Sequence, residues 1–540
     1  MKTRKEIVIF GLVFVIFLSF FGIFSIFPAN IRRTYNQTTV TSDGVSIVYD
    51  VFEPKSDTPS LRTGVILGHG VMVNKNFMRT IALDLASQGF VAIALDFRGH
   101  GRSGGTLEEG DITTDILAIK EVMTQRGDIN MTNLGYIGYS MGGGAGFRLL
   151  DTDPDFKAMV SLAAGGRTQY NTPNLLILHG KWDEAFSLTG VLEYMSDKTG
   201  LSEEEIETDR LYGSFQNGTA LKLCIANTDH LLAPYDYNNV RETRFWFLQA
   251  LNGETSPNST FTNYFLLLSS VILATLSGIY LFLLGTDLVL SKIYPSSQPK
   301  ELTEANLDLD QSELKVVMRK YWIFVLPLSI PCMVLALPLL PVPIFNMVLF
   351  SALLLGPSTA ILLFQFYILK KNRMKLKEYY SQFWTKSTIK NCFTGLLFGM
   401  LFYIILNLTI GYIFGIVPST TKWGWAILFF VVMLFIQFNF AQFFQPLVLQ
   451  GNGFNTIKQR FRGQLSVFIL FFSPIVMLVL ISLLIFQSWF NIQFLLPLLP
   501  LIIIINLISG RFYQRSHDVI IAVFTNSLYL TLLLITLANY

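Results

Sequence analysis

The stretch Gly138-Tyr139-Ser140-Met141-Gly142 decides the fold that this sequence predicts. It follows the apolar run 134–137 and precedes a run with helical character, 143–150. A G-x-S-x-G turn between a strand and a helix is typical of a nucleophile elbow, in which glycines allow the tight turn that exposes the serine hydroxyl. Glycine-rich turns with a serine are common, so Ser140 could also be an unreactive serine at the surface. The sequence around it separates these two interpretations.

Two candidate partners for Ser140 follow it along the chain, each close behind an apolar run. Asp183 comes after the run 175–178, and His230 comes after the run 221–225. Upstream, the apolar run 65–67 ends in Gly68-His69-Gly70, and a turn-rich segment at 96–105 separates it from the serine. Serine, acid and histidine in this order accompany a G-x-S-x-G elbow in hydrolases. Four such landmarks at strand ends indicate an active site more specifically than any one of them.

These residue types suit nucleophilic catalysis. A serine hydroxyl is a weak nucleophile until a neighbouring imidazole takes its proton, and a carboxylate holds that imidazole in the correct tautomer. Glu184 stays open as an alternative to Asp183, and Asp229 could either occupy a turn or tune His230. Three further histidines are predicted to be structural, because they lie in glycine-rich turns or at a strand end: His69, His100 and His179.

Residues from about 40 to 250 resemble the α/β-hydrolase superfamily, through GHG at 68–70, DFRGHGRSGG at 96–105 and GYSMGGG at 138–144. They are most similar to its monoacylglycerol-lipase and serine-aminopeptidase-like branch. The resemblance implies Ser140 as the nucleophile, His230 as the base and Asp183 as the acid that orients it. It also implies an oxyanion hole formed by the backbone N–H groups of Met141 and Val71. No metal or cofactor is expected. The rest of the chain resembles no family that we recognise.

The secondary-structure pattern of residues 38–251 agrees with that fold class. Short apolar runs alternate with helical segments, which predicts a doubly wound, mostly parallel α/β sheet. An Asp43-Gly44 turn predicts a hairpin near the start. Only about a dozen residues, 163–174, separate two predicted strands where a lid often lies, so no large lid is expected there. The acidic segment 199–219 predicts either a solvated helix or a flap near the site.

Composition places the chain in a membrane. It has 540 residues, of which 51% are hydrophobic and 14% charged, with a mean hydropathy of +0.48. Such a chain is too apolar for a soluble protein. Residues 31–260 carry 19 basic and 28 acidic residues, whereas the remainder carries 21 and 9. The basic residues punctuate apolar stretches and form no stripe, so no nucleic-acid partner is expected.

Three parts of the chain are predicted: a membrane anchor at 1–30, the hydrolase domain at 31–255 and an all-α membrane domain at 256–540. The uncharged run 7–27 would span about 31 Å as a helix, close to the thickness of the hydrocarbon core. A cleaved signal peptide is the alternative, although its apolar region would be shorter. Eight further spans are predicted, at 262–286, 321–341, 344–369, 391–416, 424–447, 465–487, 489–509 and 519–538.

The distribution of basic residues predicts the orientation of these spans. With the N-terminus in the cytoplasm, the inner loops after residue 260 carry 17 basic residues and the outer loops carry one, Lys422. Loops rich in lysine and arginine stay in the cytoplasm. The chain is therefore predicted to be a multi-pass protein of the cell membrane with an extracytoplasmic hydrolase domain. One span also carries four polar side chains that predict either interhelical hydrogen bonds or a substrate path: Gln437, Asn439, Gln442 and Gln445.

The function expected from these features is a serine hydrolase of the membrane. It would cleave a small-molecule acyl ester through an acyl-Ser140 intermediate, with the lipid bilayer as its surroundings. A serine peptidase acting on short peptides is the first alternative, because amide hydrolysis uses the same machinery. A catalytically idle binding module of a transporter or a signalling membrane protein is the second.

Overall fold

The chain packs into two compact units in the computed structural model, which describes residues 2–25, 30–55, 61–254, 264–295, 311–336, 345–381, 383–384, 386–419, 422–449, 456–486 and 492–537. We call Phe14–Ala274, Asn407–Thr421 and Thr536–Tyr540 the hydrolase unit. We call Met1–Val13, Thr275–Leu406 and Lys422–Ile535 the helical unit. A short segment beyond residue 400 therefore belongs to the same unit as the sheet.

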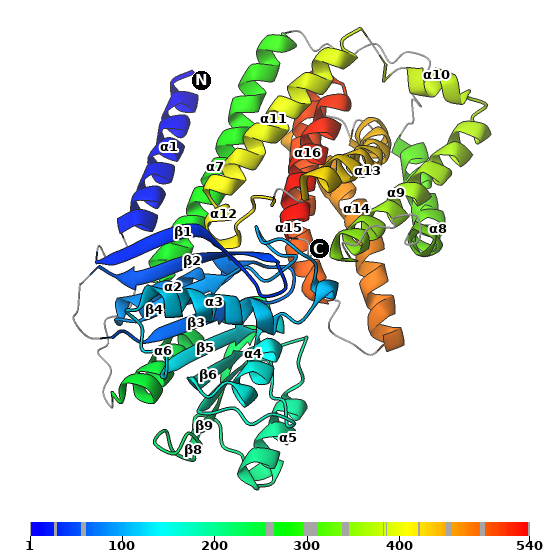
Figure 1. Ribbon diagram of the computed structural model, residues 1–540. Coiled ribbons are helices and arrows are strands. Elements are labelled where there is room, and N and C mark those ends of the chain that lie inside the picture. Colours follow the sequence, from blue (N-terminus) through cyan, green and yellow to red (C-terminus); the bar gives the residue numbers. More distant parts are fainter. Residues whose placement is uncertain are drawn as a thin grey trace. The chain divides into compact units, whose positions relative to one another are not determined.

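The hydrolase unit is built on a nine-stranded sheet with the strand order β1-β2-β4-β3-β5-β6-β7-β9-β8 (Figure 1). Its strands are β1 (Ile31–Val40), β2 (Ser46–Pro54), β3 (Gly64–Gly68), β4 (Val91–Leu95), β5 (Leu134–Tyr139), β6 (Phe156–Leu162), β7 (Leu175–Trp182), β8 (Leu211–Tyr212) and β9 (Leu221–Asp229). The pairs from β4 through β3, β5, β6 and β7 to β9 are parallel, whereas β1, β2 and β8 pair antiparallel. The predicted α/β-hydrolase sheet is thus confirmed.

Helices cover both faces of this sheet because its central strands are apolar on both sides. On β5, Tyr136 packs into one core and Ile137 into the other. The helices α2 (Arg79–Ser87) and α6 (Tyr237–Asn252) contribute to the core that contains Ile137. The opposite core takes residues from α3 (Thr113–Arg126), α4 (Met141–Thr152) and α5 (Leu188–Thr199). Strands buried on both faces are what parallel sheets require.

The element boundaries differ from the sequence prediction in instructive ways. The hairpin forms as expected, and Gly44 takes a φ of 88° in its turn. The strands β7 and β9 continue past their apolar runs, so the prediction that His179 ends its strand is wrong. In the segment 199–219, β8 pairs with residues 221 and 222. That is the opposite end of β9 from His230, so the flap prediction is wrong.

The remaining long helices are apolar. They are α1 (Lys2–Ser25), α7 (Tyr264–Ile293), α8 (Gln311–Ala336), α9 (Phe345–Lys371), α11 (Thr388–Leu408), α13 (Trp423–Phe443), α14 (Ile457–Phe486), α15 (Ile492–Ser516) and α16 (Ile520–Leu537). Among the described residues, six helices are long and apolar enough to cross a membrane: α7, α8, α9, α11, α13 and α14. Shorter apolar stretches occur at Ile7–Phe21 and Ile520–Thr536, and the predicted span 489–509 begins outside the described residues.

The predicted span 391–416 is wrong at its end, because α11 stops at Leu408. The chain then forms the one-turn helix α12 (Gly411–Phe414), and Gly415 takes a φ of 59°. Ile413 is 6% exposed and belongs to the same core as α2 and α6. Hydropathy shows that a side chain avoids water, but it does not distinguish lipid from a protein core. We call residues 409–419 the docking segment.

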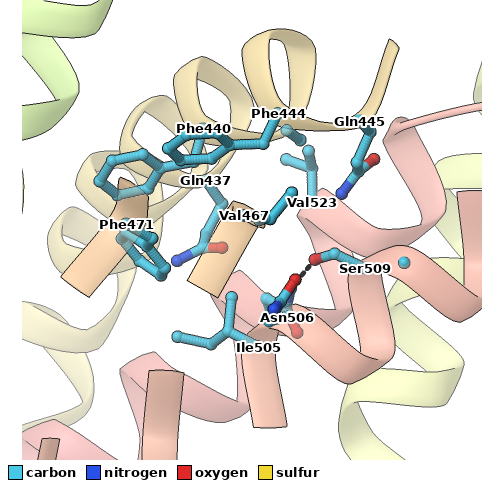
Figure 2. A pocket seen from close by; sticks show the side chains of 13 residues that line it. Gln437, Phe440, Phe444, Gln445, Val467, Phe471, Ile505, Asn506, Ser509 and Val523 are labelled. Atoms are coloured by element: carbon cyan, nitrogen blue, oxygen red, sulfur yellow. Dashed lines mark hydrogen bonds between the residues drawn. The ribbon is translucent and has the colours of Figure 1, made fainter. Parts of the chain in front are cut away.

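Two of the four polar residues that the sequence singles out make side-chain hydrogen bonds within the helical unit. Asn439 Nδ2 donates to Ser358 Oγ of α9 over 3.0 Å, and Gln442 Nε2 donates to Asn439 Oδ1 over 3.2 Å. Figure 2 shows the side chains that line a small cavity, among them Gln437 and Gln445. Asn526, which also lines this cavity, donates to Ser509 over 2.8 Å. The cavity measures about 20 Å³ and has room for little more than a water molecule. This favours the interhelical hydrogen bonds over a substrate path.

Candidate active site

Ser140 occupies a strained turn between β5 and α4. Its φ is 52° and its ψ is −113°, a backbone conformation that residues other than glycine rarely adopt. A Cβ added at Gly138 would lie 2.4 Å from the backbone of Gly142. A Cβ added at Gly142 would lie 2.6 Å from the carbonyl oxygen of Gly68. Both glycines are therefore needed for the backbone to fold tightly around the serine.

The structure brings together the three side chains that the sequence singled out. Ser140 Oγ lies 3.0 Å from His230 Nε2. On the other side of the ring, His230 Nδ1 lies 3.1 Å from Oδ2 and 3.2 Å from Oδ1 of Asp183. The side chain of Asp183 is fully buried, and that of His230 is 9% exposed. With its Nδ1–H donating to the carboxylate, the imidazole can accept a proton from the hydroxyl at Nε2.

The two acidic alternatives have other partners. Glu184 Oε2 accepts a hydrogen bond from the backbone N–H of His230 over 3.3 Å, whereas the ring Nδ1 is bonded to Asp183. Burial raises the pKa of the Glu184 carboxyl. Asp229 Oδ1 accepts from the backbone N–H of Leu232 over 2.7 Å, which is the geometry of a turn residue.

Backbone donors orient the carboxylate of Asp183. Its Oδ1 accepts hydrogen bonds from the N–H groups of Ala185 and Phe186, each over 2.9 Å. These bonds fix the carboxylate in the tight turn that follows β7. Its remaining acceptor capacity is then directed at the imidazole of His230.

Two aromatic residues beside the imidazole escaped the sequence analysis. The hydroxyl of Tyr139 donates to the carbonyl oxygen of His230 over 3.1 Å, and the two rings lie 5.4 Å apart. The ring of Phe186 lies 5.7 Å from the same imidazole. Burial holds the pKa of Tyr139 well above its usual value, so its hydroxyl stays protonated and can donate. Tyr139 directly precedes Ser140, and Phe186 follows Asp183 by three residues. This closeness in the sequence is the only signal that could have found them.

The candidate oxyanion donors belong to two neighbouring segments, the start of α4 and the loop after β3. Met141 is the first residue of α4, and the first N–H groups of a helix have no acceptor within it. Val71 follows Gly70, where an added Cβ would lie 2.9 Å from the Cβ of Ser140. The N–H of Gly142 donates to the carbonyl oxygen of His69 over 3.1 Å. This bond ties the loop after β3 to the start of α4.

His69 and His100 serve the loops around the site. His69 Nε2 accepts from the backbone N–H of Phe97 over 3.0 Å. His100 Nδ1 lies 3.0 Å from the carbonyl oxygen of Arg98. Their rings pack edge to face with centroids 5.0 Å apart. Both histidines therefore brace the two glycine-rich turns, as the sequence predicted.

The strand order and the helices on both faces define the α/β-hydrolase fold. Residues 59–210 match the model of the family described as serine aminopeptidase, S33, which confirms the resemblance read from the sequence. That match covers less than a third of the chain.

Two curated proteins are similar over shorter stretches. A non-heme chloroperoxidase from Streptomyces lividans is 34% identical over 110 residues, which is 20% of this chain and 36% of that protein. A monoacylglycerol lipase from Mycolicibacterium smegmatis is 44% identical over 62 residues, which is 12% of this chain and 21% of that protein. The chain thus spans about a third and a fifth of the lengths of these relatives.

Among solved structures, an esterase from Pyrococcus furiosus matches with 18% identity and a TM-score of 0.32. The match covers 41% of this chain and 93% of the esterase.

Proposed function

We propose that this protein is a membrane-bound serine hydrolase that cleaves small acyl esters through an acyl-Ser140 intermediate. The single observation that carries the proposal is the hydrogen-bonded chain from Ser140 Oγ to His230 Nε2 and from His230 Nδ1 to Asp183. A serine in an unreactive turn has no need of a buried imidazole and a buried carboxylate at these distances.

In the proposed reaction, Ser140 Oγ attacks the ester carbonyl while His230 Nε2 takes the hydroxyl proton. The carbonyl oxygen becomes an oxyanion, and the N–H groups of Met141 and Val71 stabilise it. When the tetrahedral intermediate collapses, His230 gives its proton to the departing alkoxide and leaves the acyl group on Ser140. Water then attacks with His230 again as the base, and this releases the carboxylic acid and restores the hydroxyl.

An ester is the preferred substrate class because one relative is a monoacylglycerol lipase. A short peptide is the second candidate, because the matched family is described as a serine aminopeptidase. A panel of acyl esters and aminoacyl amides given to the purified full-length protein separates the two. Faster turnover of the esters supports the first proposal, and faster turnover of the amides replaces it with the second.

Covalent labelling by a fluorophosphonate tests the mechanism itself. The wild-type protein should be labelled, and Ser140→Ala should not. Ser161→Ala is a matched control, because Ser161 is buried on β6 and donates to Gly165 O away from the imidazole. If well-folded wild-type protein remained unlabelled, the idle binding module would become the better interpretation.

The extracytoplasmic position of the site is part of the same proposal, and the excess of basic residues in one set of loops supports it. A charged, membrane-impermeant fluorophosphonate applied to intact cells should label the protein as fully as a permeant probe does. Labelling that appears only after the cells are opened would place the hydrolase unit inside.

A further inference from the structure

Three helices of the helical unit enclose a groove that the hydrolytic site does not use. The helices α7, α14 and α15 line it, and its volume is about 620 Å³. Its polar lining includes Arg460, Gln464 and Arg511, and its apolar lining includes Leu284, Phe468 and Ile503. A volume of this size admits a large part of an amphiphilic molecule.

The two arginines of the groove lie near one end of its length. Arg460 lies in the first turn of α14, and Arg511 lies within the last two turns of α15. Phe468 follows Arg460 by eight residues, and Ile503 precedes Arg511 by eight. Eight residues of α-helix rise about 12 Å. The two arginines therefore lie where α14 begins and α15 ends. Phe468 and Ile503 line the groove about 12 Å further along the helices.

The carboxylates of the described residues neutralise only part of the positive charge at the arginine end of the groove. Arg511 pairs with Asp287 over 3.1 Å, but the same carboxylate also accepts a hydrogen bond from Arg515 over 2.9 Å. Arg460 is half-buried and has no ion pair among the residues that the structure describes. One buried carboxylate thus pairs with two guanidinium groups, and Arg460 adds a third positive charge to the lining of the groove. An anionic headgroup would balance this charge.

A buried acceptor lies beside the two arginines. Gln464 Oε1 is buried and has no hydrogen-bond partner within the described part of the chain. The carboxamide lies against Gly510, where an added Cβ would be 1.7 Å from Gln464 Nε2. The acceptor is therefore held in place, and an unsatisfied buried oxygen favours a ligand that brings a donor. A headgroup hydroxyl is such a donor.

We propose that this groove binds one anionic phospholipid whose headgroup bears hydroxyl groups. Its phosphate pairs with Arg460 and Arg511, and a headgroup hydroxyl donates to Gln464 Oε1. Its acyl chains lie along the wall that contains Leu284, Phe468 and Ile503. Basic pockets between membrane helices bind anionic headgroups through this chemistry. The site is separate from Ser140, so the inference does not depend on the proposed hydrolysis.

Native mass spectrometry of the full-length protein in a non-ionic detergent tests the headgroup. Phosphatidylglycerol is compared with phosphatidylcholine and with oleate, all carrying the same acyl chain. We expect the wild type to retain one phosphatidylglycerol at least about fivefold better than either competitor. A fivefold margin is what one additional basic contact contributes near a bilayer surface. Equal retention of phosphatidylcholine, or stronger retention of oleate, would overturn the proposal.

Matched variants locate the site. Arg460→Gln should lower phosphatidylglycerol retention about fivefold. Arg462→Gln, two residues further along α14 on an exposed position outside the groove, should leave it unchanged. An equal loss in both variants would show that the attraction is a general surface effect and would sink the assignment.

A second pair of variants tests the apolar wall. Phe468→Trp adds bulk inside the groove and should weaken retention, whereas Ile469→Trp adds it at a neighbouring exposed position outside the groove and should not. Because both variants enlarge an apolar side chain of the same helix, general damage to folding would affect them alike. Unchanged retention in Phe468→Trp would contradict the placement of the acyl chains.

Discussion

The hydrolase unit and the helical unit differ in the polar groups that they bury. The hydrolase unit buries ionisable side chains, among them Lys75, Asp96, Arg98 and Asp115. In the described part of the helical unit, the buried polar side chains are amides and hydroxyls except for Asp287 and Lys422. Groups that can exchange protons are therefore concentrated in the unit that carries the candidate site.

The sheet explains how the hydrolase unit tolerates its buried charges. Lys75 Nζ lies 2.9 Å from Asp96 Oδ2, and Arg98 Nη2 lies 2.7 Å from Asp115 Oδ1. Burial alone would raise the pKa of Asp96, but Lys75, His69 and two backbone N–H groups together outweigh it and lower that pKa. Loops at strand ends can bring such partners together, whereas an apolar helix bundle satisfies neutral groups at less cost. Buried ion pairs therefore occur where loops meet at strand ends. The following experiments test how strictly this difference between the two units holds.

The largest effect is expected where a buried charge takes part in the reaction. Asp183→Asn should lower kcat by about 10⁴-fold, because an amide cannot hold the imidazole of His230 in the required tautomer. Glu184→Gln is the matched control, since its side chain bonds to the backbone N–H of His230 rather than to the ring. Its kcat should stay within about tenfold of the wild type, well short of the loss of a catalytic hydrogen bond. Steady-state kinetics on an ester measures both variants. A larger loss of kcat in Glu184→Gln than in Asp183→Asn would make Glu184 the orienting acid.

The next effect concerns close packing behind the serine. An added Cβ at Gly143 would lie 2.3 Å from the Cβ of Ala164, whereas one at Gly144 would meet nothing within 4 Å. Gly143→Ala should therefore destabilise the hydrolase unit by about 1–3 kcal/mol. Gly144→Ala should be neutral or stabilise it by up to about 1 kcal/mol, because alanine favours helix.

The temperature at which fluorophosphonate labelling of each variant is lost reports on this pair. A drop for Gly143→Ala with no drop for Gly144→Ala is expected. Equal behaviour would mean that α4 and the turn after β6 pack less tightly than the structure shows.

A buried acid gives the third prediction. Asp84 and Arg244 are each 2% exposed, and the Asp84 Oδ1 to Arg244 Nη1 distance is 3.5 Å. Burial, only partly offset by Arg244, raises the pKa of Asp84 to about 7. The folded state thus holds a proton that the unfolded chain releases near pH 4, so stability falls as the pH rises from about 4 to about 7.

Asp84→Asn removes this dependence. The apparent Tm of the wild type should fall more between pH 5 and pH 8 than that of Asp84→Asn. The exposed Asp151→Asn serves as the control and should keep the wild-type slope. An unchanged slope in Asp84→Asn would show that Arg244 keeps the carboxyl ionised.

The sequence could predict the site because parallel strands end at one edge of a sheet. Ser140, Asp183 and His230 each follow an apolar run, and that common position brings them together without further information. The lengths of β7 and β9 were not predictable, because the residues after their apolar runs carry no apolar pattern. They pair through backbone hydrogen bonds as far as Trp182 and Asp229.

The docking segment was missed for a different reason. Its contacts join residues that lie more than 300 positions apart in the chain. Asn74 Nδ2 donates to the carbonyl oxygens of Phe414 and Gly415 over 2.8 and 3.1 Å, and Arg79 Nη1 donates to that of Tyr412 over 2.6 Å. These bonds use main-chain acceptors, so the side chains of the segment give no sign of them in a single sequence.

The smallest effect is expected from loosening this segment. The ring of Phe77 lies 5.8 Å from that of Phe414 and 5.4 Å from that of Tyr139, whose hydroxyl holds the backbone of His230. A Cβ at Gly415 would lie 1.7 Å from Asn76 Nδ2 at a φ of 59°, so Gly415→Ala must displace the segment.

Because Phe77 is braced from both sides, we expect Gly415→Ala to lower kcat by a few-fold, on the order of 1 kcal/mol in the barrier, with little change in KM. Gly424→Ala is the matched control, since an added Cβ there meets nothing within 4 Å. A lower kcat in Gly415→Ala alone would show that a segment between two apolar helices supports the imidazole through neutral contacts. Because the docking segment belongs to the hydrolase unit, that result would sharpen the contrast: the support of the charged site would extend beyond the sheet to a distant segment of the same unit. An unaltered kcat would confine the catalytic support to residues 31–254.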